Sequence, residues 1–343
     1  MTIKAKPILG ITMGDPTGIG PEIVAKALAT DNIYKICMPV VVGDANIMQQ
    51  AVEIADVDLD IRSISKVTEA KFEFGHMDVI DLKNVDVTKL EHGKVSAMAG
   101  AAAFAAVKKV IELALDREID GTVTVPINKE ALNKAGYDFS GHTEIYAHFT
   151  GAKDYAMLLV YRNVRIIHVS THVSLREAIK LVKKDRIVKV IELLNDACKK
   201  LGVQSPKIGV AGLNPHASDG GLFGDEEKKE IIPAIEKTRN KGILVDGPVP
   251  PDTLFSKLKG GWYDGAVAMY HDQGHIPLKV IGFIWDKKTK KWKSVSGVNI
   301  TLGLPIVRTS VDHGTAFEIA GKGIALPDSL IYAIEFAAKL VSN

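Results

Sequence analysis

Short runs of consecutive apolar residues, each ending abruptly at a polar segment, most constrain the fold of this chain. Residues 265–268 form such a run, and the polar stretch 271–274 follows almost at once. A strand that is buried on both faces reads as a continuous apolar run, which is typical of parallel sheets covered by helices. Segments with helical patterns alternate with these runs along the chain. The sequence therefore predicts an α/β fold.

Histidines follow three of the apolar runs in the same relative position. The pairs are residues 164–169 with His172, residues 208–211 with His216, and residues 265–268 with His271. Ligands of open α/β sheets bind beyond the carboxyl ends of the strands, so these three imidazoles are expected to converge. Imidazole suits zinc and other divalent transition ions, and three protein ligands leave positions open for catalysis. The pattern predicts a metal site, whereas one such histidine alone would as readily be structural.

Other polar side chains are candidates for binding an anionic substrate. His142 lies beside a helix expected over 143–149, which Thr143 would cap. The same imidazole would serve equally to hydrogen-bond the turn. Lys279 follows the stretch that contains His271, and the further candidates are Asn299 and Arg308. Arginine binds carboxylate or phosphate through two parallel hydrogen bonds, and lysine acts as a point charge.

A glycine-rich turn over 14–22 connects the first strand, over 7–12, to a helix expected from residue 23. Pro21 suits the first helical position, and Glu22 suits the positive end of the helix dipole. Such a turn lets backbone N–H groups approach an anion, and Asp15 and Thr17 favour a binding site over a merely tight turn. The turn is not a dinucleotide fingerprint, because the third glycine of G-x-G-x-x-G is missing.

Length and composition exclude several classes of protein. The 343 residues suggest about two domains, and 46% hydrophobic with 24% charged residues is typical of a globular protein. A net charge of +2 without a long basic run argues against a nucleic-acid partner, and no apolar run is long enough to span a membrane. The opening residues do not resemble a signal peptide. Cys37 and Cys198 lie far apart in apolar segments, so we expect reduced thiols in a cytoplasmic protein.

Three further segments have patterns that predict structure alone. Ser96 would cap a helix over 97–115, whose small residues permit close approach of another helix. Residues 284–295 alternate around a lysine-rich turn and predict an exposed β-hairpin. Its lysines are most simply a solvated face, with attraction for phosphate as the alternative. Residues 51–90 are expected to form β-rich surface.

Longer motifs, from the first strand to the last helix, resemble those of the 4-hydroxythreonine-4-phosphate dehydrogenase family. The matching segments are Gly14-Asp-Pro-Thr-Gly-Ile-Gly-Pro-Glu22, Gly141-His-Thr-Glu144, Ser170-Thr-His172, Leu213-Asn-Pro-His216, Tyr270-His-Asp-Gln-Gly274 and Gly297-Val-Asn-Ile-Thr-Leu-Gly-Leu-Pro305. Residues 313–325 also resemble the adenosine-binding loop of isocitrate and isopropylmalate dehydrogenases. The resemblance implies their fold, with two α/β/α domains and a cleft between them. The first domain would comprise 1–128 with 308–343, and the second 129–307.

The resemblance also implies roles for individual residues. His172, His216 and His271 would bind a divalent metal (Zn, Mg, Mn or Co) at a site shared between the subunits of a homodimer. The residues that would hold a small phosphorylated substrate are His142, Thr143, Lys279, Asn299 and Arg308. Those that would hold NAD are Gly314, Thr315, Glu318, Asp15 and Thr17. The Glu318 carboxylate would repel the 2′-phosphate of NADP. Lys279 and Asp252 are the candidates for the base that takes the substrate's hydroxyl proton.

The implied reaction is an NAD-dependent oxidation and decarboxylation of a phosphorylated hydroxy acid. His275-Ile-Pro277 and the 284–295 hairpin depart from the vitamin-B6 branch of the family. Both resemble a sister branch that oxidises 4-phospho-D-threonate or 4-phospho-D-erythronate, which would yield dihydroxyacetone phosphate and CO2. His275 would either hydrogen-bond the C2 hydroxyl of such a substrate or only pack. The alternative within the family is 4-hydroxythreonine-4-phosphate dehydrogenase.

The residues alone are also compatible with two functions other than that of a dehydrogenase. A metal-dependent phosphatase or hydrolase would use three histidines and nearby cations equally well, and a non-catalytic sugar-acid sensor would need only the binding residues. The glycine-rich loop with Glu318 favours the dehydrogenase, because a hydrolase has no use for it.

Overall fold

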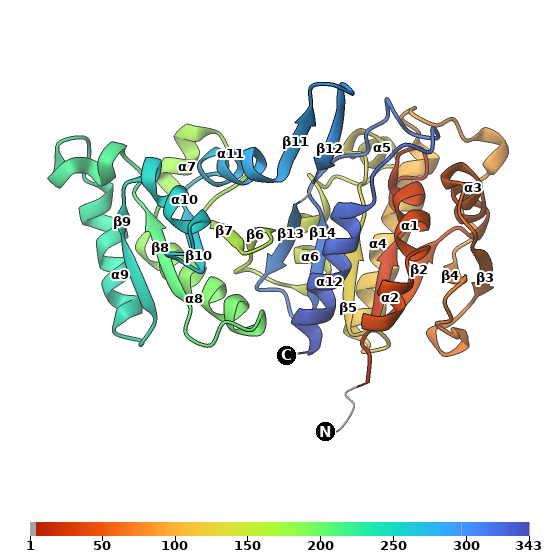
Figure 1. The fold of residues 1–343 in the computed structure, drawn as a ribbon, viewed down its shortest axis with the longest axis horizontal. Helices are drawn as coiled ribbons and strands as arrows, with labels where there is room; N and C mark the ends of the chain where they lie inside the picture. Colours follow the sequence, from red (N-terminus) through yellow and green to blue (C-terminus); the bar gives the residue numbers. More distant parts are fainter. Residues whose placement is uncertain (1–4, 296, 343) are drawn as a thin grey trace. The chain divides into compact units, whose positions relative to one another are not determined.

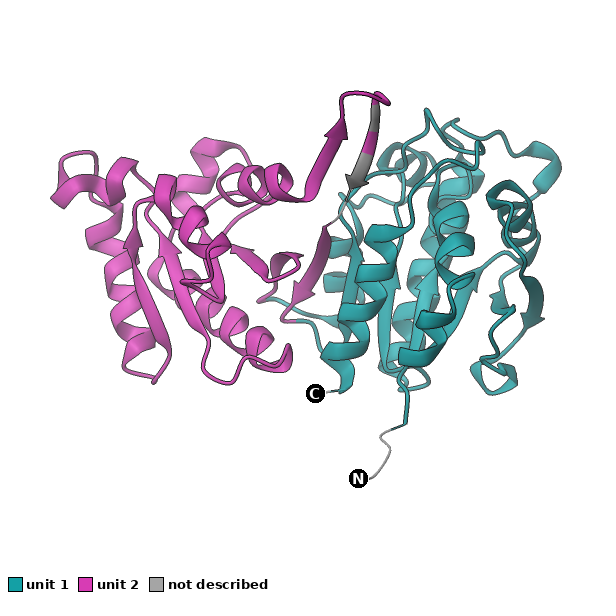
Figure 2. Ribbon diagram, viewed as in Figure 1, with its two compact units in different colours: residues 1–153, 304–342 teal, residues 154–303, 343 magenta. Residues whose placement is uncertain are grey.

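The computed structural model describes residues 5–295 and 297–342, which form two compact units (Figure 2). Unit 1 comprises the chain up to Lys153 together with 304–342, and unit 2 comprises Asp154–Gly303. The boundaries expected from the sequence lie at 128/129 and 307/308. The structure places 129–153 in unit 1, because the two helices of that segment pack against a long helix of unit 1.

Unit 1 is built on a parallel sheet with strand order β3-β4-β2-β1-β5-β14. Its strands are β1 (Ile8–Thr12), β2 (Met38–Gly43), β3 (Asp60–Ile64), β4 (His76–Asp81), β5 (Gly121–Thr124) and β14 (Val307–Val311). Helices lie on both faces (Figure 1). They are α1 (Gly20–Leu28), α2 (Asp31–Ile36), α3 (Ala45–Ala55), α4 (Ala97–Leu115), α5 (Lys129–Lys134), α6 (His142–Thr150) and α12 (Asp328–Ser342). Val107 and Val110 of α4 pack with Val40 and Val42 of β2 in the core of this unit.

Unit 2 is built on a mixed sheet with strand order β13-β6-β7-β10-β8-β9. Its strands are β6 (Ala156–Tyr161), β7 (Val164–His168), β8 (Lys207–Ala211), β9 (Leu244–Val249), β10 (Gly265–Ala268) and β13 (Val298–Leu302). Strands β7, β10, β8 and β9 are parallel, and β6 runs antiparallel to both of its neighbours. Its helices are α7 (Leu175–Leu181), α8 (Lys184–Lys200), α9 (Ile232–Arg239), α10 (Pro251–Lys259) and α11 (His271–Gly282). Leu254 of α10 and Leu278 of α11 pack with β6, β7 and β10 in the core.

The predicted α/β class is confirmed, and several elements begin and end where the sequence indicates. Helix α4 starts after Ser96, whose hydroxyl accepts a hydrogen bond from the Ala99 N–H. Its small residues allow a close contact, since a Cβ added to Gly100 would lie 2.1 Å from the carbonyl oxygen of Ala131 in α5. The hairpin expected over 284–295 is formed by β11 (Phe283–Asp286) and β12 (Lys291–Val295).

Other local expectations are wrong. The β-rich surface expected from residue 51 begins later, because α3 extends to Ala55 after the Asp44 side chain caps its first turn. Thr143 does not cap α6, since Gly141 holds the cap position and Thr143 is the second helical residue. Residues 271–282, for which no element is predicted, form α11, although they contain Gly274 and Pro277.

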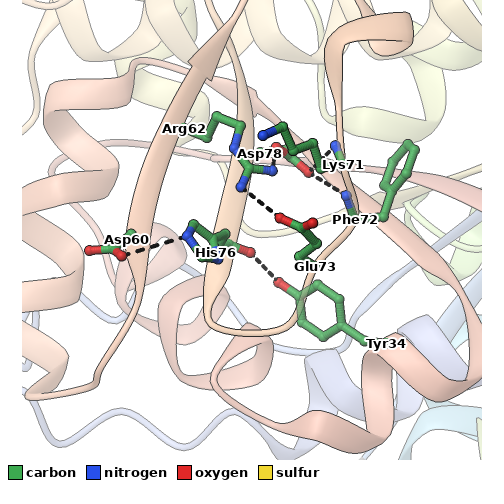
Figure 3. Close-up of polar contacts among 8 residues, drawn as sticks. All are labelled: Tyr34, Asp60, Arg62, Lys71, Phe72, Glu73, His76 and Asp78. Atoms are coloured by element: carbon green, nitrogen blue, oxygen red, sulfur yellow. Dashed lines mark hydrogen bonds and ion pairs between the residues drawn. The ribbon is translucent and has the colours of Figure 1, made fainter.

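A charged cluster ties the connection between β3 and β4 to the sheet of unit 1 (Figure 3). Arg62 on β3 pairs with Asp78 on β4, with Nη1 and Oδ1 3.0 Å apart, and with Glu73, with Nη2 and Oε2 3.0 Å apart. The buried Asp78 carboxylate also accepts hydrogen bonds from the backbone N–H groups of Lys71 and Phe72, at 3.1 and 2.8 Å. The buried carboxylate is thus satisfied by the fold itself, so we assign the cluster a structural role.

The two cysteines are buried free thiols, as expected. Burial raises the pKa of Cys37 to about 12 and that of Cys198 to about 11, so neither is a reactive thiolate at neutral pH. Within residues 5–295 and 297–342, no helix is both long and apolar enough to cross a membrane.

Candidate functional site

The three histidines follow strands that are neighbours in the sheet of unit 2. Strand β10 pairs in parallel with β7 on one side and with β8 on the other. His172 follows β7, His271 opens α11 after β10, and His216 lies in the 3-10 segment η3 (Pro215–Gly221) after β8. Because the carboxyl ends of parallel strands share one edge, all three positions lie where α/β sheets bind ligands.

His172 and His271 come close together at this edge. Their ring centres are 5.9 Å apart, and both side chains line a cavity of about 400 Å³. The Nδ1 atom of His271 lies 2.6 Å from Oδ1 of Asp272, which leaves Nε2 for a ligand. A carboxylate on the second ring nitrogen is the usual partner of a metal-binding histidine. These two residues therefore fit a divalent cation, whose bonds to histidine nitrogen are about 2.0–2.1 Å long.

His216 does not complete the expected three-ligand set within one chain. Among the residues that the structure describes, no group of three or more His, Cys, Asp or Glu side chains is placed to hold a metal ion. The common strand-end position thus brings two of the three imidazoles together. The loop conformation after β8, which the sequence does not reveal, determines where the third one lies.

The backbone that carries His216 is strained. Residues 216–219 have φ angles between 45° and 70°, in the left-handed region. That region costs non-glycine residues roughly 1–2 kcal/mol each. The buried Glu227 carboxylate stabilises the start of the segment, since Oε1 accepts hydrogen bonds from the N–H groups of Leu213 and Asn214, each at 2.8 Å. Strain maintained by surrounding contacts is typical of functional segments.

Residues between His271 and His275 fix the start of α11. Gln273 accepts a hydrogen bond from the Met269 N–H at 2.6 Å and donates to the Gly212 carbonyl at 2.9 Å. It thereby ties the end of β10 to the end of β8. Gly274 makes room for a side chain of β7, because a Cβ at this position would lie 2.3 Å from Nε2 of His168.

Two further histidines, His275 and His168, lie behind His271. His275 is 6% exposed, and its ring stacks on His271 with centres 3.6 Å apart and planes 12° apart. Burial, with the neighbouring imidazoles, lowers the pKa of His275 to about 3. Burial lowers the pKa of His168 to about 4. His275 is thus a buried, neutral side chain that stacks on His271.

His168 was not among the predicted site residues. The signal that marks it is a polar side chain on the face of β7 where the alternate residues Val164 and Ile166 are apolar. Its Nδ1 lies 3.2 Å from the Met157 carbonyl oxygen, and its buried Nε2 has no hydrogen-bond partner among the described residues.

Arg308 in unit 1 is a buried cation at a predicted substrate position. It is 3% exposed, and it donates to the Thr124 hydroxyl through Nε at 3.2 Å and Nη2 at 2.8 Å. Its guanidinium carbon lies 5.5 Å from the centre of the Tyr146 ring. Burial lowers the pKa of Arg308 to about 10, so the side chain stays protonated at neutral pH. A buried positive charge of this kind suits an anionic ligand.

His142 and Thr143 lie in the first turn of α6, and the charge of Arg308 acts on His142. Burial, followed by that positive charge, lowers the pKa of His142 well below its usual value. Its Nε2 is buried without a hydrogen-bond partner among the described residues, and so is Oδ1 of Asn299 on β13 in unit 2. Leaving a buried polar atom unsatisfied costs about 1–3 kcal/mol, so a polar ligand would stabilise either position.

The two candidate bases lie in unit 2 with the histidines. Lys279 is half-buried on α11, and its Nζ lies 5.4 Å from the centre of the Phe283 ring. It follows His275 by four residues, so both lie on one side of the helix. Asp252 is exposed in the first turn of α10, which packs against the segment that carries His216.

The two predicted cofactor segments lie against each other in unit 1. The Ile19 N–H donates to the Thr315 carbonyl at 3.1 Å, and a Cβ added to Gly18 would lie 3.0 Å from Cβ of Thr315. Further along, Glu22 accepts a hydrogen bond from the Ala325 N–H at 2.7 Å. The turn over 14–22 thus supports both ends of the loop over 313–325.

The side chains expected to contact NAD differ in exposure. Asp15 and Thr17 are buried, and Oδ1 of Asp15 accepts hydrogen bonds from the Thr17 N–H at 2.8 Å and hydroxyl at 2.7 Å. This pair stabilises the turn, as the tight-turn interpretation requires. Gly314 and Glu318 are exposed on the loop.

Comparisons with known proteins place this geometry in a family. Residues 35–337 match the family described as pyridoxal phosphate biosynthetic protein PdxA. The chain is 46% identical over 338 residues to D-threonate 4-phosphate dehydrogenase of Cupriavidus necator, with 98% of each chain covered. It is 43% identical to a solved 4-hydroxythreonine-4-phosphate dehydrogenase from Burkholderia phymatum, with a TM-score of 0.83 over 98% of this chain and 99% of that one. The corresponding Klebsiella pneumoniae enzyme is 41% identical, with a TM-score of 0.85 over 100% of both chains. The chain therefore belongs to the PdxA family and is an oxidoreductase of the dehydrogenase type.

Proposed function

We propose that the protein oxidises and decarboxylates a 4-phosphorylated four-carbon 3-hydroxy acid, with NAD as the oxidant. The substrate is 4-phospho-D-threonate or 4-phospho-D-erythronate. C3 loses a hydride to NAD, the C3 hydroxyl loses its proton to a base, and the resulting β-keto acid loses CO2 to give dihydroxyacetone phosphate. The observation that carries this proposal is the buried Arg308 beside His142, which suits a phosphate dianion. The name of the Cupriavidus necator relative supports the choice of substrate.

His172, His216 and His271 are proposed to hold a divalent cation, for which zinc fits the imidazole donors. When bound, such an ion supplies Lewis-acid chemistry, which lowers the pKa of a substrate hydroxyl and polarises a ketone. Asp272 contributes by holding Nδ1 of His271, so that Nε2 faces the ligand. Among the described residues no three such side chains are grouped to hold a metal ion, and we propose that at least one of the three imidazoles comes from a second copy of the chain.

An apolar surface on α7 and α11 supports that second copy. Leu175 and Ile179 of α7 are 59% and 42% exposed, and Ile276 and Val280 of α11 are 59% and 76% exposed. Each pair is four residues apart and so forms a ridge along its helix. Leu175 lines the same cavity as His172 and His271, so a copy packed here would lie beside the candidate metal site.

The buried free thiols are in keeping with a reducing, cytoplasmic setting.

Lys279 is the proposed base for the C3 hydroxyl proton. It is half-buried on the same side of α11 as His275, one turn further from His271, whereas Asp252 is exposed on α10. Its positive charge would also attract an anionic substrate. The side chains proposed to hold the phosphorylated end are His142, Thr143, Asn299 and Arg308.

The loop over 313–325 is proposed to hold NAD, which supplies the hydride acceptor. Glu318 presents an exposed carboxylate that would hydrogen-bond the ribose hydroxyls and repel the 2′-phosphate of NADP. E318Q is expected to raise the KM for NAD and to reduce the preference for NAD over NADP. Steady-state rates with both cofactors test this role, and equal efficiency of the unmodified enzyme with NAD and NADP would remove its basis.

4-Phosphohydroxythreonine is the second candidate substrate, because the solved relatives carry the corresponding name. It has an ammonium at C2 where the proposed substrates have a neutral hydroxyl. The test compares kcat/KM for the two hydroxy acids and the amino acid, with NAD and a divalent metal present. A preference of tenfold or more for the amino acid would assign the protein to the other branch. An absence of NAD reduction with all three would overturn the proposal.

A further inference from the structure

We propose that His275 is a positioning residue, whose imidazole holds the ring of His271 at the angle needed to bind the metal. The inference rests on the metal role proposed for His271. His271 and Asp272 line the cavity, whereas His275 does not. His275 would therefore act through His271 and not by touching the substrate.

The rings of His271 and His275 are in face-to-face contact. With centres 3.6 Å apart and planes 12° apart, one full face of His271 lies on His275. Nδ1 of His275 also lies 2.9 Å from the backbone oxygen of His271, one helical turn earlier. Asp272 holds an edge of the His271 ring, so the ring is fixed on an edge and on a face.

His275 is itself held in place by a side chain of the sheet. His168 on β7 lies against it, with ring centres 4.7 Å apart and planes 43° apart. His168 is held in turn by its contact with the Met157 carbonyl on β6. Gly274 leaves the space that the His168 ring needs. A continuous stack of side chains thus runs from the central strands to His271, and His275 is its middle member.

This arrangement predicts that His275 affects metal affinity without binding the metal. Replacing partners that orient a metal-binding histidine typically weakens metal affinity by about 10- to 100-fold. Two substitutions separate the two contacts of His275. His275→Gln keeps a polar side chain that is able to hydrogen-bond the His271 backbone but removes the ring, and His275→Phe keeps a ring that is able to stack but removes the hydrogen bond.

The experiment titrates the metal-free full-length protein with zinc in competition with a chromophoric chelator. H275Q is expected to bind zinc roughly 10- to 100-fold more weakly than the parent, and H275F is expected to stay close to the parent. H148Q is the matched control, because His148 is an exposed histidine of unit 1 whose ring contacts the rings of Phe139 and Phe149, far along the chain from His271. Unfolding midpoints of all variants establish that they are folded.

A second readout needs no metal. In the metal-free protein, the NMR signals of the His271 ring carry a ring-current shift from His275, which H275Q removes and H275F retains. Unchanged His271 signals in H275Q, or zinc affinity equal to that of the parent, would overturn the proposal. A loss of affinity in H275F as large as in H275Q would equally exclude stacking as the cause. If the parent binds no divalent ion at all, the proposed metal role fails, and the NMR comparison still decides whether His275 positions His271.

Discussion

Arg308 and His168 are both buried, but burial leaves them in different charge states. The pKa of Arg308 falls to about 10, so its guanidinium is still protonated at pH 7. The pKa of His168 falls to about 4, so its imidazole is neutral there. His142, whose pKa is lowered well below the usual value by burial and by Arg308, is neutral as well. In the proposed function, Arg308 would therefore supply the charge that attracts a phosphate, and His142 would supply a neutral hydrogen bond.

Arg308→Lys is expected to weaken binding of the phosphorylated substrate. Lysine keeps the charge but lacks the guanidinium's several donors, two of which already bind Thr124. Hydrogen bonds to charged groups contribute about 1.5–3 kcal/mol, so kcat/KM should fall roughly 10- to 100-fold, mainly through KM. Steady-state kinetics check this, with R239K as a control, since Arg239 donates to the Val245 carbonyl in unit 2. An unchanged KM in R308K would contradict the role.

His168 should make the protein sensitive to mild acid. Its folded-state pKa, about 4, lies below the unfolded value of 6.5, so the folded state resists protonation. Stability is therefore full above pH 6.5 and is lost as the pH falls toward 4, by about 2 kcal/mol between pH 7 and pH 5. Urea unfolding at those two pH values should show a smaller loss in H168Q than in the parent. The exposed-site variant H148Q should lose as much stability as the parent, and an equal loss in H168Q would refute the assignment.

Whole elements of this protein are more predictable from sequence than their contacts. The apolar run of β10 predicts a strand buried on both faces, and Ser96 predicts the start of α4. Both signals are local in the sequence. No element is predicted over α11, which contains Gly274 and Pro277, and Gly274 is needed for a non-local reason, because it leaves room for the His168 ring. The sequence likewise identifies His172, His216 and His271 as residues that follow strands. It does not reveal which two of the imidazoles lie close together, because that depends on non-local geometry. That geometry includes the left-handed backbone of residues 216–219.

Because α4 and α5 are in close contact, replacing Gly100 with alanine is expected to destabilise the protein, although helix propensity alone would favour alanine. Alanine normally stabilises a helix interior by about 1 kcal/mol relative to glycine. At Gly100 the added Cβ would lie 2.1 Å from the Ala131 carbonyl oxygen, a backbone atom that is unable to swing aside. G100A is therefore expected to lower the free energy of unfolding by roughly 1–3 kcal/mol, as overpacked cores do. Thermal or urea unfolding measures this.

The reverse substitution in the same helix serves as the control. Ala105 is half-buried, and A105G should cost only the propensity difference, about 1 kcal/mol. If G100A instead stabilises the protein, then α4 and α5 do not approach as closely as described.

At the scale of the whole molecule, the candidate metal site and the exposed apolar ridges both bear on the proposed dimer. The described part of one chain lacks a complete set of three ligands, although three histidines follow neighbouring strands. The ridges on α7 and α11 expose large apolar side chains, and Leu175 of the α7 ridge also lines the cavity that His172 and His271 line. Exposed apolar patches of this kind are typical of interaction surfaces. The proposed second copy of the chain would cover the ridges and contribute a histidine to the proposed metal site.

Val280→Asp is expected to separate that dimer into monomers. Val280 is the most exposed of the four ridge residues, at 76%, and burying an unpaired carboxylate against an apolar partner costs several kcal/mol. Sedimentation velocity should show a dimer for the parent and a lighter species for V280D, whose zinc affinity and turnover should fall together, since the ligand set would be broken. L244D is the matched control, because Leu244 is 56% exposed on β9, outside both ridges, and its variant should remain dimeric. A parent protein that sediments as a fully active monomer would show that the metal site, if present, is built by one chain.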